Sequence, residues 1–474
     1  MGKRFCCAIT LIAIGWAIAG LAAAAATDTQ SIAVAVRDQA LSGQSVAWSL
    51  LSELTTDIGT RPAGSAAERA AADWAAAKLR AFGFSNVSLQ QFPMVAWHRG
   101  IEHVELLGAY GPQTLAAAAL GGSPPTPAQG VAGEVVAFSS LQALQAAPAE
   151  ALAGKIALIT RKLVVTQDGT GYLAALGGRS RGPAEAAQRG AVGFLMRSLG
   201  TGGHRFAHTG STAYAGDTGP IPAFALAAAD ADQIERRRAA GEKVHVRLFS
   251  SASFSKDAQS QNVIAEIPGR DRPEEVVLIG AHLDCWDLGT GAIDDGSGVA
   301  IVTAAAKLIL EQPRRPRRTI RVVLFGAEEV TQPHAQPLGD KVYVRAHAAD
   351  IGSHVLTGES DFGAGWIYSV SLPRGLADTP FAATLGELLG PVGTDISKWD
   401  AEHTGTDVKP LVDLGVPSFK LNHDGSRYFE YHHTVDDTLD KIEPATLSQN
   451  VAAWATLVWL AADTDINFRM GSQP

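Results

Sequence analysis

The sequence predicts an α/β protein with a mixed, centrally parallel sheet that is flanked by helices. Two observations carry this prediction. Residues 276–280 form a short, continuously apolar run, as expected for a strand buried on both faces, and 319–325 have the pattern of a second buried strand. The segment 297–310 between them has helical character, and such alternation of strand and helix is typical of parallel sheets. In these sheets the polar side chains that bind ligands gather where the strands end.

The remaining elements of this part of the chain follow from local patterns. In 65–83, apolar residues recur at intervals of three and four, which predicts a helix. Ser65 and Glu68 form a capping-box pattern at its start. Weaker strand candidates lie at 353–357 and 417–421.

The first 26 residues have the layout of a secretory signal peptide. Lys3 and Arg4 precede an apolar stretch over 6–22, and a run of alanines comes directly before Thr27. We therefore expect cleavage before Thr27 and an exported protein, periplasmic or extracellular, with a retained membrane anchor as the alternative. No other stretch of the sequence approaches the roughly 18 to 20 apolar residues that a membrane span needs.

The net charge and the cysteine count argue against general nucleic-acid binding and against an internal disulfide. The chain of 474 residues carries a net charge of −9, which argues against general nucleic-acid binding because phosphate contacts need clustered Lys and Arg. We interpret the one basic run, 314–318, as a solvated turn between a helix and a strand. Loss of the leader also leaves Cys285 as the one cysteine, so no internal disulfide is expected.

The domain organisation follows from a change in composition. A Gly/Pro/Ser-rich stretch at 121–127 is followed by strand patterns at 131–138, 155–160, 192–196 and 244–249 and a helix pattern at 183–189. This block has no cluster of metal-ligating side chains, so we interpret 126–250 as an inserted domain without catalytic residues. The main domain is then expected from 27–125 and 251–474, after the signal peptide at 1–26.

Five segments carry the candidate chemistry. They are His282-Leu283-Asp284, the glycine-rich loop 289–298 with Asp294 and Asp295, Glu328-Glu329, Glu359-Ser360-Asp361, and His432-His433 with Asp436 and Asp437. Each has a structural explanation when taken alone, such as a solvated turn for adjacent acids. In combination, two histidines and three carboxylates are a ligand set that suits paired Zn²⁺ or a similar divalent ion.

The His-x-Asp pattern makes a further, local prediction. In an extended chain the side chains of His282 and Asp284 point the same way. We therefore expect the Asp284 carboxylate to hydrogen-bond the imidazole nitrogen that faces away from the metal, which fixes the tautomer of His282.

This ordered set of motifs resembles the co-catalytic zinc peptidases of the M28 aminopeptidase type, and among them the plasma glutamate carboxypeptidase (carboxypeptidase Q) branch. The matching strings are 280–287, 291–296, 328–329, 359–361 and 433–438, together with the start at 61–65. The resemblance covers nearly the whole mature chain. It implies a zinc exopeptidase/phosphorylase-like fold in which the inserted block is a β-rich protease-associated (PA) domain.

The resemblance also implies a role for each residue. Asp294 would be a ligand of both metals. His282 and Asp361 would complete the ligands of one metal, and Glu329 and His433 would complete those of the other. Glu328 would act as general base and acid, and Asp284 would orient His282. The implied reaction is hydrolysis of dipeptides or removal of N-terminal residues by a water shared between two Zn²⁺, other divalent metals being an alternative. The expected partner is a short peptide, with no nucleic acid and no membrane anchor after cleavage; monomer and homodimer stay open.

Several site assignments have alternatives. His432 could replace His433 as a ligand, although His433 alone has the His-Thr-x-x-Asp-Thr context. Tyr428 or Tyr431 would either stabilise the oxyanion or hold a substrate terminus, or else pack in the core. Cys285 lies near the site but outside the ligand pattern, so we expect it to be inert or to support a ligand.

The chain departs from many relatives after Glu329, where the proline-containing stretch 330–337 follows. This departure affects the predicted substrate specificity more than the predicted metal binding. We expect His334, within this stretch, to be solvated. Two other functions use the same scaffold: a catalytically inactive binding protein and a glutaminyl-cyclase-like acyltransferase. The complete set of ligands together with Glu328 argues against the first, and the PA-like insertion argues against the second.

Overall fold

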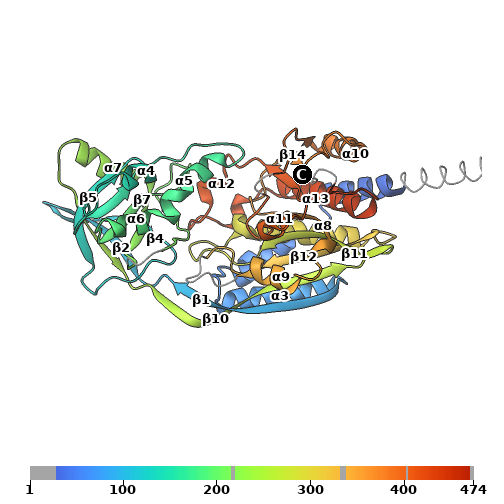
Figure 1. The fold of residues 1–474 in the computed structure, drawn as a ribbon, viewed down its shortest axis with the longest axis horizontal. Helices are drawn as coiled ribbons and strands as arrows, with labels where there is room; N and C mark the ends of the chain where they lie inside the picture. Colours follow the sequence, from blue (N-terminus) through green and yellow to red (C-terminus); the bar gives the residue numbers. More distant parts are fainter. Residues whose placement is uncertain (1–27, 215–218, 331–337, 402–403, 470–474) are drawn as a thin grey trace, which may run out of the picture.

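The computed structural model describes residues 28–214, 219–330, 338–401 and 404–469. Within these ranges the chain forms two units that lie end to end, each built on its own large sheet (Figure 1). The predicted signal peptide lies outside the described residues. Among the helices that are described, none combines the length and the apolar character needed to cross a bilayer.

The larger unit is built on a five-stranded sheet in the order β1-β10-β12-β11-β13. Its strands are β1 (Ser85–His98), β10 (Ser253–Ile267), β12 (Arg318–Phe325), β11 (Arg272–His282) and β13 (His354–Glu359). β12, β11 and β13 are parallel, whereas β10 and β1 are antiparallel to their neighbours. The predicted mixed sheet with a parallel centre is therefore confirmed.

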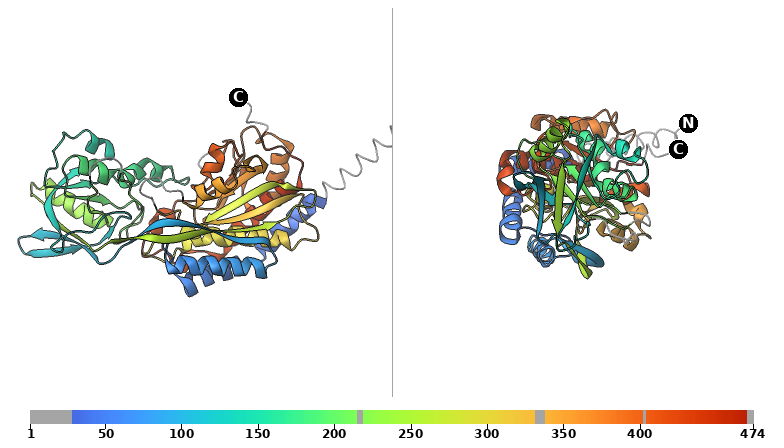
Figure 2. Two further views of the ribbon diagram at one scale, coloured as in Figure 1. Left: turned by 60° about the horizontal axis from the view of Figure 1, so that its bottom comes forward. Right: turned by 90° about the vertical axis from the view of Figure 1, so that its left-hand side faces the viewer.

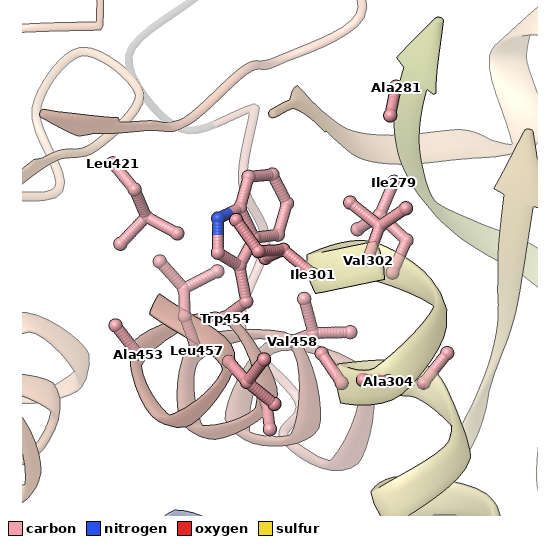
Figure 3. Packing of buried hydrophobic residues seen from close by; sticks show 14 of the residues in the cluster. Ile279, Ala281, Ile301, Val302, Ala304, Leu421, Ala453, Trp454, Leu457 and Val458 are labelled. Atoms are coloured by element: carbon pink, nitrogen blue, oxygen red, sulfur yellow. The ribbon is translucent and has the colours of Figure 1, made fainter. Parts of the chain in front are cut away.

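Helices cover both faces of this sheet, as the apolar runs predict. On one face of the sheet, Val277 and Ile279 of β11 belong to a core that is shared with α2 (Ala47–Glu53), α3 (Ala66–Ala81), α8 (Ser297–Leu310) and α13 (Pro444–Asp463). The opposite face, with Val276 and Leu278, packs against α9 (Gly339–Ala346) and α11 (Lys409–Asp413). Figure 3 shows the centre of the larger core, where Trp454 of α13 lies beside Ile301 of α8.

The rest of the larger unit is a small sheet with short helices around it. The sheet has the order β15-β14-β16, from β14 (Ile367–Ser371), β15 (Asp395–Ile396) and β16 (Lys420–His423). α10 (Pro380–Leu389) follows β14, and α12 (Tyr428–Tyr431) follows β16. The strand expected at 417–421 is thus β16, shifted toward the C-terminus and outside the main sheet.

The second unit contains an eight-stranded sheet in the order β3-β2-β9-β5-β6-β7-β8-β4. Its strands are β2 (Glu102–Gly108), β3 (Gly111–Leu115), β4 (Ala117–Ala119), β5 (Val131–Phe138), β6 (Ile156–Ile159), β7 (Gly193–Arg197), β8 (Ala223–Leu226) and β9 (His245–Ser250), and its helices are α4 (Leu141–Gln145), α5 (Thr170–Ser180), α6 (Gly182–Gln188) and α7 (Ala228–Ala239). β2, β3 and β4 precede residue 126, so this unit begins earlier than the boundary expected from composition. That it is a PA domain stays a prediction.

Two long strands join the units. β1 and β10 pair antiparallel from Ser85 opposite Glu266 to His98 opposite Ser253. They carry the chain out to the second unit and back again, and they run along the junction with α3 below the sheet (Figure 2). The second unit is therefore inserted through two adjacent strands and not through a single flexible linker.

The basic run at 314–318 serves the structure of the larger unit. Arg314 forms an ion pair with Asp463 at 2.7 Å, and Arg318 forms one with Glu275 at 2.5 Å. These pairs tie the turn between α8 and β12 to the end of α13 and to β11. The expected turn is present, but its arginines are largely paired with acids of this same chain.

Candidate metal centre

The candidate site lies at the carboxyl ends of the three parallel strands. His282 is the last residue of β11, Glu328 and Glu329 follow the end of β12, and Asp361 follows the end of β13. The register places His282 opposite Phe325 and Gly280 opposite Glu359, so the three strands end at one edge. The sheet thereby brings together side chains that are far apart in the sequence.

Asp294 lies between the two predicted histidine ligands. Its Oδ1 is 3.2 Å from Nε2 of His282, and its Oδ2 is 3.0 Å from Nε2 of His433. On the first side, Nε2 of His282 is also 3.4 Å from Oδ1 of Asp361. On the second side, Nε2 of His433 is also 3.0 Å from Oε2 of Glu329. The five residues thus form two groups that share one carboxylate.

The neighbouring His432 also approaches this carboxylate. Its Nε2 is 3.4 Å from Oδ2 of Asp294, and its ring stacks on that of His433 with 3.5 Å between the centroids. Potential ligand atoms of Asp294, His432 and His433 lie within 4.8 Å of one another, as do those of His282, Asp294 and Asp361. Of the two adjacent rings, His433 is the one that also contacts Glu329.

The carboxylates of this site are buried close to one another, which shifts their pKa values. Burial raises the pKa of Glu329 and of Asp361, and the neighbouring Asp294 raises both further. Burial lowers the pKa of His282, but its hydrogen bonds to Asp294 and Asp361 raise it well above the usual value. Among the described residues, Oε1 of Glu329 has no hydrogen-bond partner. An orphaned carboxylate oxygen among imidazole and carboxylate donors fits a bound divalent cation such as Zn²⁺.

The turn that carries Glu328 and Glu329 is strained and is held by Asp284. Ala327, directly before the two acids, has a φ of 62°, a conformation that residues other than glycine rarely adopt. The Asp284 carboxylate accepts hydrogen bonds from the backbone N–H of Glu328 at 3.0 Å and of Glu329 at 3.3 Å. Asp284 thus orients the turn that follows β12.

The predicted side-chain contact between Asp284 and His282 differs from the structure. Nδ1 of His282 is 3.0 Å from the backbone carbonyl oxygen of Asp284, whereas the closest carboxylate oxygen is 3.9 Å away. The physical reason is that two buried backbone N–H groups compete for the carboxylate. The imidazole is still oriented by residue 284, but through its main chain.

Two residues hold the glycine-rich loop that delivers Asp294. Arg61 is fully buried, and its guanidinium donates to the carbonyl oxygens of Leu283, Thr290 and Gly291 at 2.6, 2.6 and 2.9 Å. The Asp437 carboxylate accepts from the N–H of Ile293 at 2.6 Å and of Asp294 at 3.3 Å. The sequence contains both residues in its matched strings, but nothing in the spacing indicates that they meet this loop.

Cys285 is a packing residue beside this loop. Its side chain is buried, and burial raises the pKa of its thiol to about 12. Gly291 has a φ of 61°, and a Cβ there would lie 2.4 Å from the Cβ of Cys285. The thiol therefore stays protonated and fills the space under the loop.

A cavity of about 720 Å³ opens onto the site from between the two units. The larger unit contributes Asp294, Glu328, Glu329, Asp361, His432, His433 and Tyr428, and the second unit contributes Tyr172, Arg179 and Ser211. Tyr431 is not among the lining residues, and its hydroxyl accepts a hydrogen bond from Arg427 at 2.8 Å. The cavity has the size of a small-molecule or short-peptide site. The second unit, in which no catalytic residues were expected, forms part of its wall.

Comparison with known proteins identifies the family. Residues 262–458 match the family model described as peptidase family M28. Carboxypeptidase Q of Mus musculus is 33% identical over 444 residues, which cover 92% of this chain and 90% of the mouse protein. Carboxypeptidase Q of Homo sapiens is 32% identical over 428 residues, covering 89% of this chain and 86% of the human protein.

Solved structures agree with this match. The structure of a peptidase M28 precursor from Shewanella amazonensis has a TM-score of 0.89 and 43% sequence identity, covering 93% of this chain and 98% of that one. A zinc aminopeptidase from Bacillus subtilis shares the fold, with a TM-score of 0.62 at 20% identity, covering 89% of this chain and 96% of that one. The chain therefore belongs to peptidase family M28 and is a metallopeptidase.

Proposed function

We propose that this protein is a zinc exopeptidase with two Zn²⁺ that hydrolyses short peptides, either free dipeptides or substrates that lose their N-terminal residue. The observation that carries the proposal is the position of Asp294, with one carboxylate oxygen toward His282 and the other toward His433. A carboxylate shared in this way is typical of two-metal hydrolytic sites. The relatives named carboxypeptidase Q and zinc aminopeptidase support a peptidase that acts at chain ends.

The two ions would be held by residues of the larger unit. His282, Asp294 and Asp361 would hold one, and Asp294, Glu329 and His433 the other. When bound, Zn²⁺ polarises a carbonyl and lowers the pKa of a coordinated water, so that hydrolysis proceeds near neutral pH. His432, stacked on His433, is the alternative ligand on the second side.

Glu328 is the proposed general base and acid. It lies beside the ligand Glu329 and faces the cavity, and burial raises its pKa to about 7. A carboxylate with this pKa accepts the proton of the attacking water as the oxygen bonds to the scissile carbonyl carbon. It then donates that proton to the leaving amine as the C–N bond breaks. Asp284 holds the backbone of Glu328 during both transfers.

The cavity supports a substrate with two charged ends. Its wall combines acids of the site with the cations Arg179, Lys409 and Lys420. Lys409 is paired with Asp413, whereas Arg179 is buried with its Nε unpartnered among the described residues. A volume of about 720 Å³ accommodates a few residues and excludes a folded chain.

The proposed place of action lies outside the cytoplasm. The basic, apolar and small-residue order of the first 26 residues supports export to the periplasm or the medium. In that setting the enzyme would act on peptides outside the cytoplasm.

The test is release of free amino acids from a panel of unblocked, N-acetylated and C-amidated dipeptides by the protein beginning at Thr27, with and without a zinc chelator. Chelator-sensitive cleavage of unblocked dipeptides is the expected result, and the blocked members report which terminus is recognised. Loss of ammonia from N-terminal Gln substrates without release of amino acids would instead establish a glutaminyl cyclase. No turnover after zinc reconstitution would leave the binding protein as the remaining function.

A further inference from the structure

A short segment of the second unit, 208–211, crosses the junction and contacts two of the proposed metal ligands. The backbone N–H of Thr209 donates to the carbonyl oxygen of His433 at 3.0 Å, and the Thr209 carbonyl oxygen is 3.2 Å from Nδ1 of the same histidine. The hydroxyl of Ser211 donates to the carbonyl oxygen of Glu329 at 2.6 Å. Both contacted residues belong to the same side of the site.

Of the two groups near Nδ1 of His433, the Thr209 carbonyl oxygen at 3.2 Å can accept a proton, whereas the Arg179 guanidinium at 3.3 Å is a donor only. An imidazole that coordinates through Nε2 carries its proton on Nδ1, and a hydrogen bond from Nδ1 sets the orientation of the ring. Thr209 supplies the acceptor. His433 also has a φ of 62°, which a histidine adopts only where its surroundings hold it. The N–H of Thr209 provides one such hold by binding the His433 carbonyl.

The segment is itself anchored on both sides. The hydroxyl of Thr209 donates to the carbonyl of Ala119 at 2.8 Å and accepts from Arg99 at 3.1 Å. Arg99 in turn forms an ion pair at 2.6 Å with Asp287 of the larger unit. The Arg179 guanidinium donates to the Thr209 carbonyl at 3.4 Å. The carbonyl that receives Nδ1 of His433 is therefore held in place by charged groups.

Gly210 makes room for this arrangement. A Cβ at this position would lie 2.3 Å from the central carbon of the Arg179 guanidinium, so any side chain would push Arg179 away from Thr209. The residue has a φ of 133°, in the region that favours glycine.

Within the described residues, the hydrogen-bond partners of His282, on the opposite side of the site, come from the larger unit. Nδ1 of His282 bonds to the carbonyl of Asp284, and the backbone N–H of His282 donates to Asp295 at 3.1 Å. Both partners belong to the larger unit. The two histidines are thus oriented by different units of the molecule.

We propose that the segment 208–211 is a positioning element for the metal held by Glu329 and His433, so that the second unit sets the affinity of one of the two metal sites. This inference rests on the proposed function for the identity of the ligands. It assigns to the inserted unit a part in metal binding, in addition to its contribution to the cavity wall.

The test compares Ser211→Ala with Thr212→Val. Ser211→Ala removes the hydroxyl that holds Glu329. Thr212→Val is the matched control, because the Thr212 hydroxyl donates to Gly121 at 2.8 Å and so acts within the second unit. Zn²⁺ is titrated into metal-free protein against a chromophoric chelator, which resolves two binding steps. Unfolding of each metal-free variant, followed by circular dichroism, reports whether the fold is intact.

The expected result is that Ser211→Ala weakens one Zn²⁺ step about tenfold and leaves the other unchanged, while Thr212→Val matches the wild type in both steps. Thr209→Val, which removes the hydroxyl anchored by Arg99, should weaken the same step by a smaller factor. Equal weakening of both steps, or no difference between Ser211→Ala and Thr212→Val, would overturn the inference. The wild-type titration tests the proposed function separately, because fewer than two Zn²⁺ bound would refute the two-metal site itself.

Discussion

The two units both contain parallel strands, but among the residues that the structure describes, the candidate ligands follow the strand ends of the larger unit alone. In the larger unit, β11, β12 and β13 end beside His282, Glu328, Glu329 and Asp361. In the second unit, β5 to β8 are also parallel, yet β6 ends before Thr160 and β7 before Ser198. Arg197 at the end of β7 is paired with Asp232 at 2.6 Å.

This difference shows that the edge of a parallel sheet can hold an active site, and that the residues following each strand decide whether an active site is present there. The larger unit supplies carboxylates and imidazoles. The second unit supplies backbone groups, a hydroxyl and an arginine that surround them. Substitutions in each unit test this division of roles.

The strongest test removes the shared carboxylate. Asp294→Ala should abolish binding of both Zn²⁺, and with it peptidase activity, because the residue faces both histidines. Metal content after gel filtration measures the effect. Asp436→Ala is the control, since Asp436 contacts Lys441 at the surface. Retention of two tightly bound ions in Asp294→Ala would refute the bridging role.

Next in size is the loss of the proposed base. Glu328→Gln keeps the shape of the side chain but cannot accept a proton, so kcat should fall by about 10²- to 10⁴-fold. The zinc content should stay at the wild-type level, in contrast to Glu329→Gln, which should lose one ion. Steady-state kinetics and metal analysis of the same samples measure both. Zinc loss in Glu328→Gln would mean that base and ligand have been exchanged.

A core substitution tests whether the units are stabilised separately. Trp454→Ala removes a fully buried ring from the interface between α13 and α8 (Figure 3). It should lower the free energy of unfolding of the larger unit by about 3 to 5 kcal/mol, as measured by denaturant unfolding. Trp399→Ala, at a ring that is 81% exposed, should change it by less than about 0.5 kcal/mol. A single transition that shifts as a whole would show that the units unfold together.

The smallest expected effect is a pH dependence with one contribution from each unit. Burial lowers the pKa of His208 in the second unit to about 3 and that of His354 in the larger unit to about 4. Below pH 6.5 the unfolded chain binds protons at these positions, whereas the folded chain does not, so stability falls as the pH drops from 6.5 toward 4.

Denaturant midpoints of metal-free protein at pH 7, 6 and 5 measure this slope. His208→Gln should flatten the slope for the second unit and His354→Gln that for the larger unit. An unchanged slope in both variants would show that other groups dominate the acid sensitivity.

Much of the larger unit was predictable because its patterns are local. The apolar run before His282 identifies β11, and the helix pattern over 297–310 coincides with α8. The N-terminal cap of α3 is as predicted, since Ser65 accepts from the N–H of Glu68 at 3.1 Å. Strand ends mark candidate ligands because polar residues follow apolar runs abruptly there. The structure brings all five predicted ligands together.

The contacts that sequence reasoning missed depend on parts of the chain that are distant from one another. Nothing in the sequence places Arg61 against the loop at 289–298, because this contact arises only when distant parts of the larger unit pack together. The contact of Thr209 with His433 likewise arises only when the second unit packs against the larger one. The partner of the Asp284 carboxylate was also not predictable, since a turn more than forty residues away supplies its two N–H donors.

The fold class could be predicted from the sequence, as could the order of the polar residues that follow the strands and the identities of the candidate ligands, since these depend on residue type and short-range periodicity. The folded structure was needed to show that Asp294 faces both histidines, that Asp284 orients His282 through its main chain, and that the second unit reaches the site. Hydrogen-bond partners are chosen by proximity in space, and in this chain that proximity is created by a parallel sheet and by an insertion carried on two long strands.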